Sequence, residues 1–307
     1  MTYDMTKNIS AHIGGRDIPL SSFMFSAGEI QVRISHAIIP LLKAFPGVPI
    51  VVRAHLRSSH DIMALFLLLD AFSQLEPKRR FSNRIDLIIP YFPYARQDRA
   101  CAAGESYASA LIARLLAASQ PSSHTIVRSL TVWDIHSDRS IPSRAYPINN
   151  IPAKQLAYDL LVKHPDYIIV RPDAGAEERA VGVATVIDAP VIRMEKTRNP
   201  ETGQLSGFKF VDRDSVSCVS GGCPLLIVDD ICDGGRTFNG IVKEIHSVDE
   251  SAVVDLYVTH GIFSAGFEHF CGIRHIYIAN NVNGIELPKG FVSLIDPEKI
   301  TDGPLCS

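Results

Sequence analysis

The stretch LLIVDDICDGGRTF, residues 225 to 238, has the residue types of a site that binds a sugar phosphate. An apolar run leads into Asp229 and Asp230, and a turn with two glycines follows. Glycines let the backbone approach a ligand closely, and the amides of such a turn, with the N-terminus of the next helix, attract a phosphate. The two acids would then face ribose hydroxyls or a metal. The plainer alternative is a solvated loop whose Asp233 caps a helix.

A second segment, IIPYFPYARQDR at residues 88 to 99, places polar side chains among aromatic ones after an apolar run. Arg96 offers a planar guanidinium for a polyphosphate, and Gln97 offers an amide for the edge of a base. The alternative is an ordinary surface cluster of arginine and aspartate, since exposed ion pairs are common and weak.

Three further features are chemically suggestive. RMEKTRNPETGQLSGFKF, residues 193 to 210, is a polar, glycine-containing stretch that could form a lid, or simply a solvated basic hairpin. His136 and Asp173 each follow an apolar run, where a doubly wound fold places ligands. A lone histidine is more often structural, and Mg²⁺ prefers oxygen ligands.

The elements that must position these residues alternate between short β-branched runs and segments of helical period, which predicts βα units and mainly parallel sheets. The stretch IPSRAYPINNIP separates two such series, so we expect domains at residues 1–148 and 149–307. Each is expected to be an open, doubly wound, Rossmann-like α/β sheet with ligands at the carboxyl ends of its strands. The expected strands are 49–52, 85–89, 129–133, 167–170, 191–194, 224–228, 252–258 and 275–278, and the expected helices are 61–73, 105–118, 153–164, 177–184 and 237–247.

Composition narrows the function class. The 307 residues are 46% hydrophobic and 21% charged, with a net charge of −3 and no basic block, so no nucleic acid partner is expected. The longest apolar run, Ile62 to Leu69, is too short to cross a bilayer, and the N-terminus lacks the pattern of a signal peptide. We therefore expect a cytoplasmic protein without a membrane partner. Its six cysteines lack metal-ligand spacing and are expected to be reduced thiols.

Five segments, in order, resemble those of the ribose-phosphate pyrophosphokinase (PRPP synthetase) family. Besides the two quoted first, they are FSAGEIQVRI at 25 to 34, RPDAGAEERA at 171 to 180 and THGIFS at 259 to 264. The resemblance covers nearly the whole chain. It implies two phosphoribosyltransferase-type domains, an N-terminal one that binds ATP and a C-terminal one that binds ribose 5-phosphate. It also implies Mg²⁺-dependent transfer of the β,γ-diphosphate of ATP to the C1 hydroxyl, giving PRPP and AMP.

The same resemblance assigns roles to individual residues. Lys196 and Arg198 would close over the reacting phosphates and stabilise their charge. His136 and Asp173 would act around Mg²⁺, although His136 could work through water or the phosphates. The residues expected to bind ATP are Phe25, Ala27, Gly28, Glu29, Arg96 and Gln97. The residues expected to bind the ribose phosphate are Asp229, Asp230, Asp233, Gly234, Gly235, Arg236 and Thr237.

The loop with Phe25 and Glu29 would be contributed by a neighbouring subunit, so a homo-oligomer of dimers assembled into hexamers is expected. Phe25 could stack on the adenine, but a place in the hydrophobic core is the more ordinary role for a phenylalanine.

The sequence departs from the family pattern in three places. The phosphate loop has Arg236 where the family usually has glycine, and the ATP loop has Ala27 where aspartate is usual. The segment after Arg99 lacks the usual basic, proline-containing stretch.

The arginine keeps open a larger acceptor that ends in ribose 5-phosphate, such as ADP-ribose. A non-catalytic regulatory homologue is disfavoured by Lys196, Arg198, His136 and Asp173, and a plain phosphoribosyltransferase is disfavoured by YARQDR.

Overall fold

A computed structural model describes residues 3–75, 84–119, 127–141, 147–198 and 205–295. The chain divides into two compact units, Met1–Asn150 (unit 1) and Ile151–Ser307 (unit 2), whereas the predicted boundary lies between 148 and 149. Each unit contains a mainly parallel sheet, and the predicted α/β fold class is confirmed. Among the described residues, no helix is long and apolar enough to span a membrane.

Unit 1 is built on a six-stranded sheet in the order β2-β1-β5-β6-β7-β8. Strands β5, β6 and β7 are parallel, and β1 runs antiparallel to both β5 and β2. The bounds are β1 Ile9–Ile13, β2 Arg16–Asp17, β5 Ile50–Ala54, β6 Ile85–Ile88, β7 Val127–Trp133 and β8 Ile148–Ile151, with short 3₁₀ turns η1 Met5–Lys7 and η2 Asp138–Ser140.

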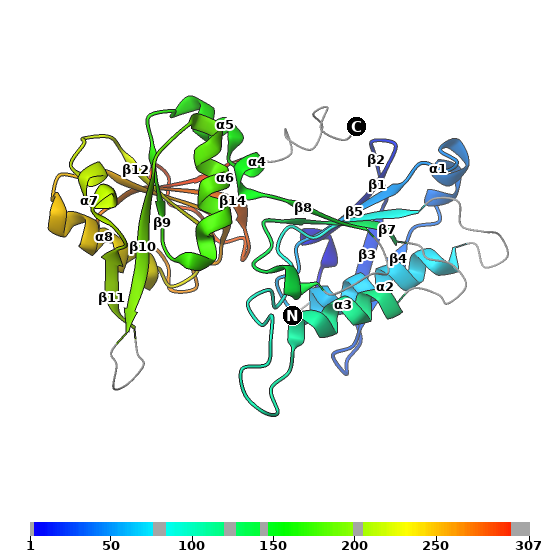
Figure 1. Ribbon diagram of the computed structural model, residues 1–307. Coiled ribbons are helices and arrows are strands. Elements are labelled where there is room, and N and C mark those ends of the chain that lie inside the picture. Colours follow the sequence, from blue (N-terminus) through cyan, green and yellow to red (C-terminus); the bar gives the residue numbers. More distant parts are fainter. Residues whose placement is uncertain (1–2, 76–83, 120–126, 142–146, 199–204, 296–307) are drawn as a thin grey trace. The chain divides into compact units, whose positions relative to one another are not determined.

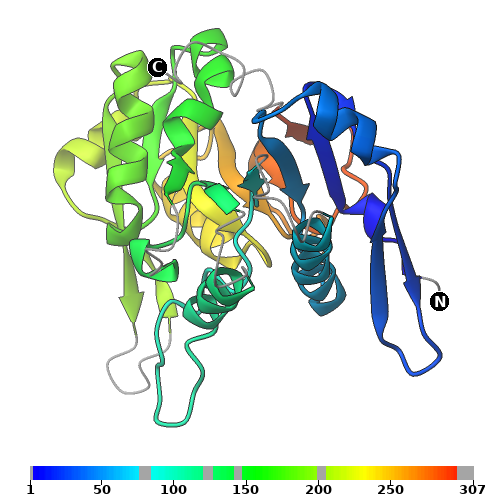
Figure 2. The ribbon, with the colours of Figure 1, turned by 90° about the vertical axis from the view of Figure 1, so that its right-hand side faces the viewer.

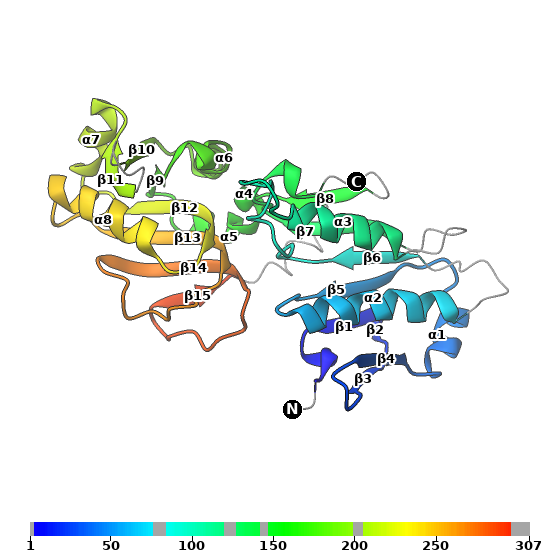
Figure 3. The same cartoon turned by 90° about the horizontal axis from the view of Figure 1, so that it is seen from below.

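Helices α2 (Ser59–Gln74) and α3 (Ala108–Ala118) lie on one face of this sheet, and α1 (Ile38–Ala44) packs onto the same core (Figures 1 and 3). Helix α2 begins two residues before the predicted start at Asp61, because Ser58 caps it: the Ser58 hydroxyl oxygen accepts a hydrogen bond from the Asp61 amide. Helix α3 begins three residues later than the predicted Glu105, because the carboxylate of Glu105 accepts the amides of Cys101 and Ala102 in the preceding turn.

A separate two-stranded hairpin, β3 (Leu20–Met24) and β4 (Ile30–Ile34), extends from unit 1 (the long blue hairpin at the right of Figure 2). The predicted elements did not include this hairpin or β1 and β2. Its tip holds the segment that resembles an ATP-contacting loop.

Unit 2 is built on a seven-stranded sheet in the order β11-β10-β9-β12-β13-β14-β15. All neighbouring pairs are parallel except β10 and β11, which form an antiparallel ribbon. The bounds are β9 Ile168–Arg171, β10 Val191–Arg198, β11 Leu205–Phe210, β12 Leu225–Cys232, β13 Val254–Gly261, β14 Ile273–Asn281 and β15 Val292–Leu294, and the helical elements are α4 Ala153–Leu156, α5 Tyr158–Lys163, η3 Ala174–Ala176, α6 Glu177–Ile187, α7 Arg213–Val219 and α8 Arg236–Val248.

Both faces of this sheet are covered, because successive residues of β12 point to opposite sides. Leu225 and Ile227 pack with α7 and α8, whereas Leu226 and Val228 pack with α4, α5 and α6. The apolar spacing of α8, at positions 238, 241, 242 and 245, matches one helix face. The predicted single helix 153–164 is instead α4 and α5, separated at Ala157, and nothing in the local sequence explains this break.

Candidate active site

The glycine-containing turn predicted to bind a phosphate follows the carboxyl end of β12 and leads into α8. Together with the first two residues of α8 it forms the 233–237 loop. Gly235 is the N-cap of α8 and has φ 64°, a left-handed conformation that favours glycine. A Cβ atom at this position would lie 2.6 Å from Cε1 of Phe270. The loop therefore requires glycine both for its backbone and for its packing.

Asp233 fixes this loop to the chain that follows β13. Its Oδ1 atom accepts hydrogen bonds from the amide and the hydroxyl of Ser264, at 3.1 and 2.5 Å. The alternative role of Asp233 as a helix cap is wrong, because Gly235 occupies the cap position and, in the described part of the chain, no side chain caps α8. Arg236 is exposed and has no hydrogen bond or ion pair with any described residue, and Thr237 is half-buried on the first turn of the helix.

Asp229 and Asp230 are consecutive residues in the C-terminal half of β12. Arg179 of α6 lies near both, with Nη1 3.7 Å from Asp229 Oδ1 and Nη2 3.9 Å from Asp230 Oδ2. Burial, and then the neighbouring charge of Asp230, raise the pKa of Asp229 well above its usual range, while Arg179 opposes that shift. The pair forms an acidic site held against one buried guanidinium.

Lys196 and Asp173 are in direct contact. Lys196 Nζ lies 2.5 Å from Asp173 Oδ2, while Asp173 Oδ1 accepts the Gly175 amide at 2.9 Å. Lys196 belongs to the β10–β11 ribbon, which projects beyond the sheet (Figure 1), so the predicted lid is a strand ribbon over its described residues. Arg198 ends β10, and its side chain lies outside what the structure describes.

Strand order brings these groups to one edge. Strands β10, β9 and β12 are neighbours, and β9 and β12 are parallel, so their carboxyl ends lie at the same edge of the sheet. Asp173 follows β9 and the 233–237 loop follows β12 at this edge, and Asp229 lies in β12 near its carboxyl end. Carboxylates, a lysine and a helix N-terminus together can bind a sugar phosphate and stabilise charge on a transferring group.

In unit 1, Arg96 and Gln97 lie on the loop that follows β6, and both side chains are exposed. The loop is held by its backbone, because the hydroxyls of Ser109 and Ser140 donate to the carbonyl oxygens of Gln97 and Ala95. A fixed backbone that leaves both polar side chains exposed suits ligand binding.

The hairpin tip places Phe25, Ala27, Gly28 and Glu29 in exposed positions. Phe25 is 49% exposed and makes an edge contact with Phe23, with 5.1 Å between ring centres. The expectation of an ordinary core role for Phe25 is therefore wrong. Gly28 has φ 90°, which the tight turn requires.

His136 is exposed in the segment after β7, in unit 1, whereas Asp173 belongs to unit 2. Within the described ranges, no group of three or more His, Cys, Asp or Glu side chains could hold a metal ion. The carboxylate of Asp173 is an oxygen donor, 27% exposed, and suits a cation that also binds substrate phosphates.

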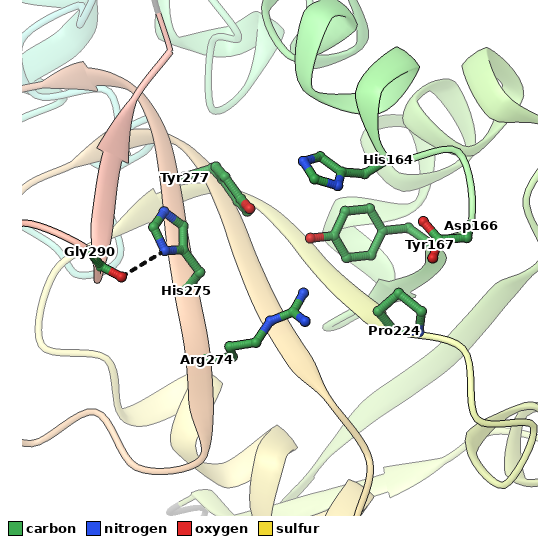
Figure 4. Close-up of a pocket in the computed structure, with 8 residues that line it drawn as sticks. All are labelled: His164, Asp166, Tyr167, Pro224, Arg274, His275, Tyr277 and Gly290. Carbon is green, nitrogen blue, oxygen red and sulfur yellow. Dashed lines mark hydrogen bonds between the residues drawn. The ribbon is translucent and has the colours of Figure 1, made fainter.

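A pocket of about 390 Å³ lies at the opposite, amino edge of the unit 2 sheet (Figure 4). Tyr167 and Arg274 both donate to Asp255, which is fully buried. His275 is held by the Gly290 carbonyl and the Ser293 hydroxyl. The charges of Arg274 and Asp255 neutralise each other within the fold. We therefore assign the pocket a structural role and place the candidate site at the other edge of the sheet.

Sequence patterns missed three residues that shape the site. Arg179, Ser264 and Phe270 contact Asp229, Asp233 and the position of Gly235, respectively. Of these three, only Arg179 could have been anticipated from the sequence, because two adjacent aspartates in a buried strand require a nearby cation.

Comparison with known proteins points to one family. Residues 2–119 match the family model described as the N-terminal domain of ribose phosphate pyrophosphokinase. The chain is 28% identical to a ribose-phosphate pyrophosphokinase of Thermosipho africanus, over 94% of this chain and 86% of the relative. It is 28% identical to the same enzyme of Maricaulis maris, over 85% and 77%.

A solved structure shares the fold. The phosphoribosylpyrophosphate synthetase of Mycobacterium smegmatis superposes with a TM-score of 0.66 at 22% identity, over 92% of this chain and 88% of that one.

Proposed function

The chain belongs to the ribose-phosphate pyrophosphokinase family, and we propose that it transfers the β,γ-diphosphate of ATP to the C1 hydroxyl of ribose 5-phosphate, giving PRPP and AMP. The observation that carries this proposal is the edge where Asp229, the 233–237 loop and the Lys196–Asp173 pair converge. This edge supplies ribose contacts, a phosphate cradle and a cation for charge stabilisation.

The acceptor is assigned to unit 2. The amides at the start of α8 would bind the 5-phosphate, because the helix dipole and its unpaired N–H groups favour an anion. Asp229 and Asp230 would accept hydrogen bonds from the ribose hydroxyls. Arg179 limits the repulsion between the two carboxylates, so they can remain together without a ligand.

ATP is assigned to Arg96 and Gln97 of unit 1, with Phe25, Ala27, Gly28 and Glu29 of the hairpin tip. An exposed phenylalanine at a hairpin tip offers a flat apolar face for a base. Because this tip extends from its own sheet, we propose that it completes the site of a neighbouring subunit in a homo-oligomer.

Mg²⁺ is the metal that the family generally uses, and we propose that Asp173 holds it together with the substrate phosphates. His136, a nitrogen donor, is better suited to the phosphates than to this hard cation. When bound, Mg²⁺ neutralises charge on the polyphosphate. Lys196 would then move from Asp173 to the transferring group, where charge stabilisation speeds the reaction.

The guanidinium of Arg236 is exposed and has no partner among the residues that the structure describes, which favours one alternative acceptor, ADP-ribose, whose second phosphate it would meet. Purified protein should be incubated with ATP, Mg²⁺ and either ribose 5-phosphate or ADP-ribose, and the products separated by mass. Addition of two phosphate groups to ribose 5-phosphate supports PRPP synthesis. Reaction with ADP-ribose alone would favour the alternative, and reaction with neither would refute both.

A further inference from the structure

Arg171, the last residue of β9, is a buried arginine whose side chain is only 10% exposed. A guanidinium removed from water destabilises a fold unless polar groups replace the water. Its Nη1 donates to Glu177 Oε2 at the start of α6, and its Nη2 donates to the Met194 carbonyl of β10 at 3.3 Å. One side chain thus joins β9, α6 and β10.

The contact with Met194 falls where β10 changes partner. Up to Arg193, β10 pairs with β9, and from Met194 onward it pairs with β11. Lys196 lies two residues further along, and its ion-pair partner Asp173 lies two residues beyond Arg171. The Arg171–Met194 and Asp173–Lys196 contacts are therefore successive links between the same two segments.

Stability alone does not account for this arginine. Its Nε atom is buried and has no hydrogen-bond partner among the described residues. The desolvation of a buried ion pair offsets most of its attraction, and an apolar residue of similar volume often does as well. Glu177 is also 42% exposed and has a second cation near it, Arg193 Nε at 3.6 Å.

We propose that Arg171 is a positioning residue, which fixes the base of the β10–β11 ribbon so that Lys196 meets the reacting phosphates. A guanidinium suits this task because its planar fork holds a carboxylate and a carbonyl in fixed directions, which an ammonium group does not. The inference rests on the proposed function, in which Lys196 stabilises the transferring group.

The test is a double-mutant cycle of Arg171→Met and Lys196→Ala with kcat and KM as readouts. Arg171→Met is expected to lower kcat about tenfold and to change KM for ATP less than about threefold, because misplaced catalytic groups lose rate more than binding. In the Lys196→Ala background, the same change should lower kcat less than about twofold, since the group it positions is gone.

Two further variants give the cycle its controls. Lys209→Met removes an exposed ion pair with Glu195 on the same ribbon, at 2.9 Å, and should leave kcat within about twofold. Glu177→Gln removes the charged partner of Arg171 and should change kcat and KM in the same way as Arg171→Met. This variant keeps the proposal testable if Arg171→Met fails to fold.

Hydrogen exchange separates this inference from the proposed function. In Arg171→Met, the ribbon amides at 194–198 and 206–210 should exchange faster than in Lys209→Met or the unmutated protein. If the unmutated protein makes no PRPP, the proposed function fails, and exchange still decides whether Arg171 holds the ribbon. Unchanged ribbon exchange, or equal kcat losses with and without Lys196, would overturn the positioning role.

Discussion

Lys196 Nζ lies 2.5 Å from Asp173 Oδ2, an ion pair that joins the β10–β11 ribbon to the segment after β9. The two side chains are 35% and 27% exposed, so solvent screens the pair and its contribution to stability is at most about 1 kcal/mol. The main effect of the pair is on the position of the lysine, which it holds at the edge of the sheet with Asp229 and the 233–237 loop.

Lys196→Ala should therefore lower kcat strongly and the melting temperature little. Loss of a charge-stabilising donor lowers kcat on the order of 10²-fold or more, whereas loss of an exposed pair shifts Tm by only a few degrees. Arg198→Ala is expected to lower kcat on the same scale. Steady-state kinetics and thermal unfolding of both variants check this. A lysine variant with normal kcat and a raised KM for ATP would show that Lys196 only binds substrate.

Gly235→Ala should destabilise unit 2 and weaken binding of the acceptor. A left-handed conformation costs a non-glycine residue about 1–2 kcal/mol, and the new Cβ atom would clash with Phe270 at 2.6 Å. Gly234→Ala is the matched control, because the φ of Gly234 is not positive and, apart from its chain neighbours, no atom of the described residues lies within 4 Å of the added Cβ. Chemical denaturation measures the free energy of unfolding of the two variants. Equal stability of the two variants would contradict the packing of the loop.

Asp229→Asn should stabilise the ligand-free protein at neutral pH. Its folded pKa is raised above the unfolded value, so its contribution favours folding below the unfolded pKa and is lost as pH rises through the folded pKa. The variant should melt at a higher temperature than the unmutated protein at pH ~7, and the difference should shrink towards pH ~4.

Asp212 supplies a contrast of opposite sign. It caps α7, and hydrogen bonds from Ser215 lower its pKa, so this carboxylate favours folding above its unfolded pKa. Asp212→Asn should therefore lower the melting temperature at neutral pH. If Asp229→Asn behaves the same way, the burial and repulsion assigned to Asp229 are wrong.

Arg236→Gly distinguishes the two acceptors. The backbone amides of α8 already suit a single phosphate, so turnover of ribose 5-phosphate should change little. With ADP-ribose, loss of a charge-assisted hydrogen bond of about 1.5–3 kcal/mol should lower kcat/KM roughly 10- to 100-fold. Equal losses with both acceptors would mean that Arg236 contacts the shared 5-phosphate.

The sequence predicted the parts of the fold that depend on local pattern. The apolar run of β12, its two acids, the glycine turn and α8 follow one another within residues 225–248, so spacing alone indicated a strand, a loop and a helix. By contrast, β1 has only three inward apolar residues in a five-residue alternation, Ile9, Ala11 and Ile13, which is too short a pattern to indicate a strand.

Contacts between residues on different strands could not be predicted from such local patterns. The Asp173–Lys196 and Asp233–Ser264 contacts join residues 23 and 31 apart, and they depend on strand order, which hydrophobic period does not specify. The resemblance to the family indicated the residues expected in the site. It could not indicate that Arg171 would be buried between Glu177 and Met194, because that burial follows from how β10 leaves the sheet.

The fate of the β-phosphorus of ATP tests the central claim most directly. ATP labelled at the β-phosphorus should be incubated with the protein, Mg²⁺ and ribose 5-phosphate, and the labelled products separated. Transfer of a diphosphate predicts label in PRPP, unlabelled AMP in equal amount and no ADP. Label retained in ADP, formed in step with consumption of the acceptor, would contradict the account and identify a kinase that transfers a single phosphate.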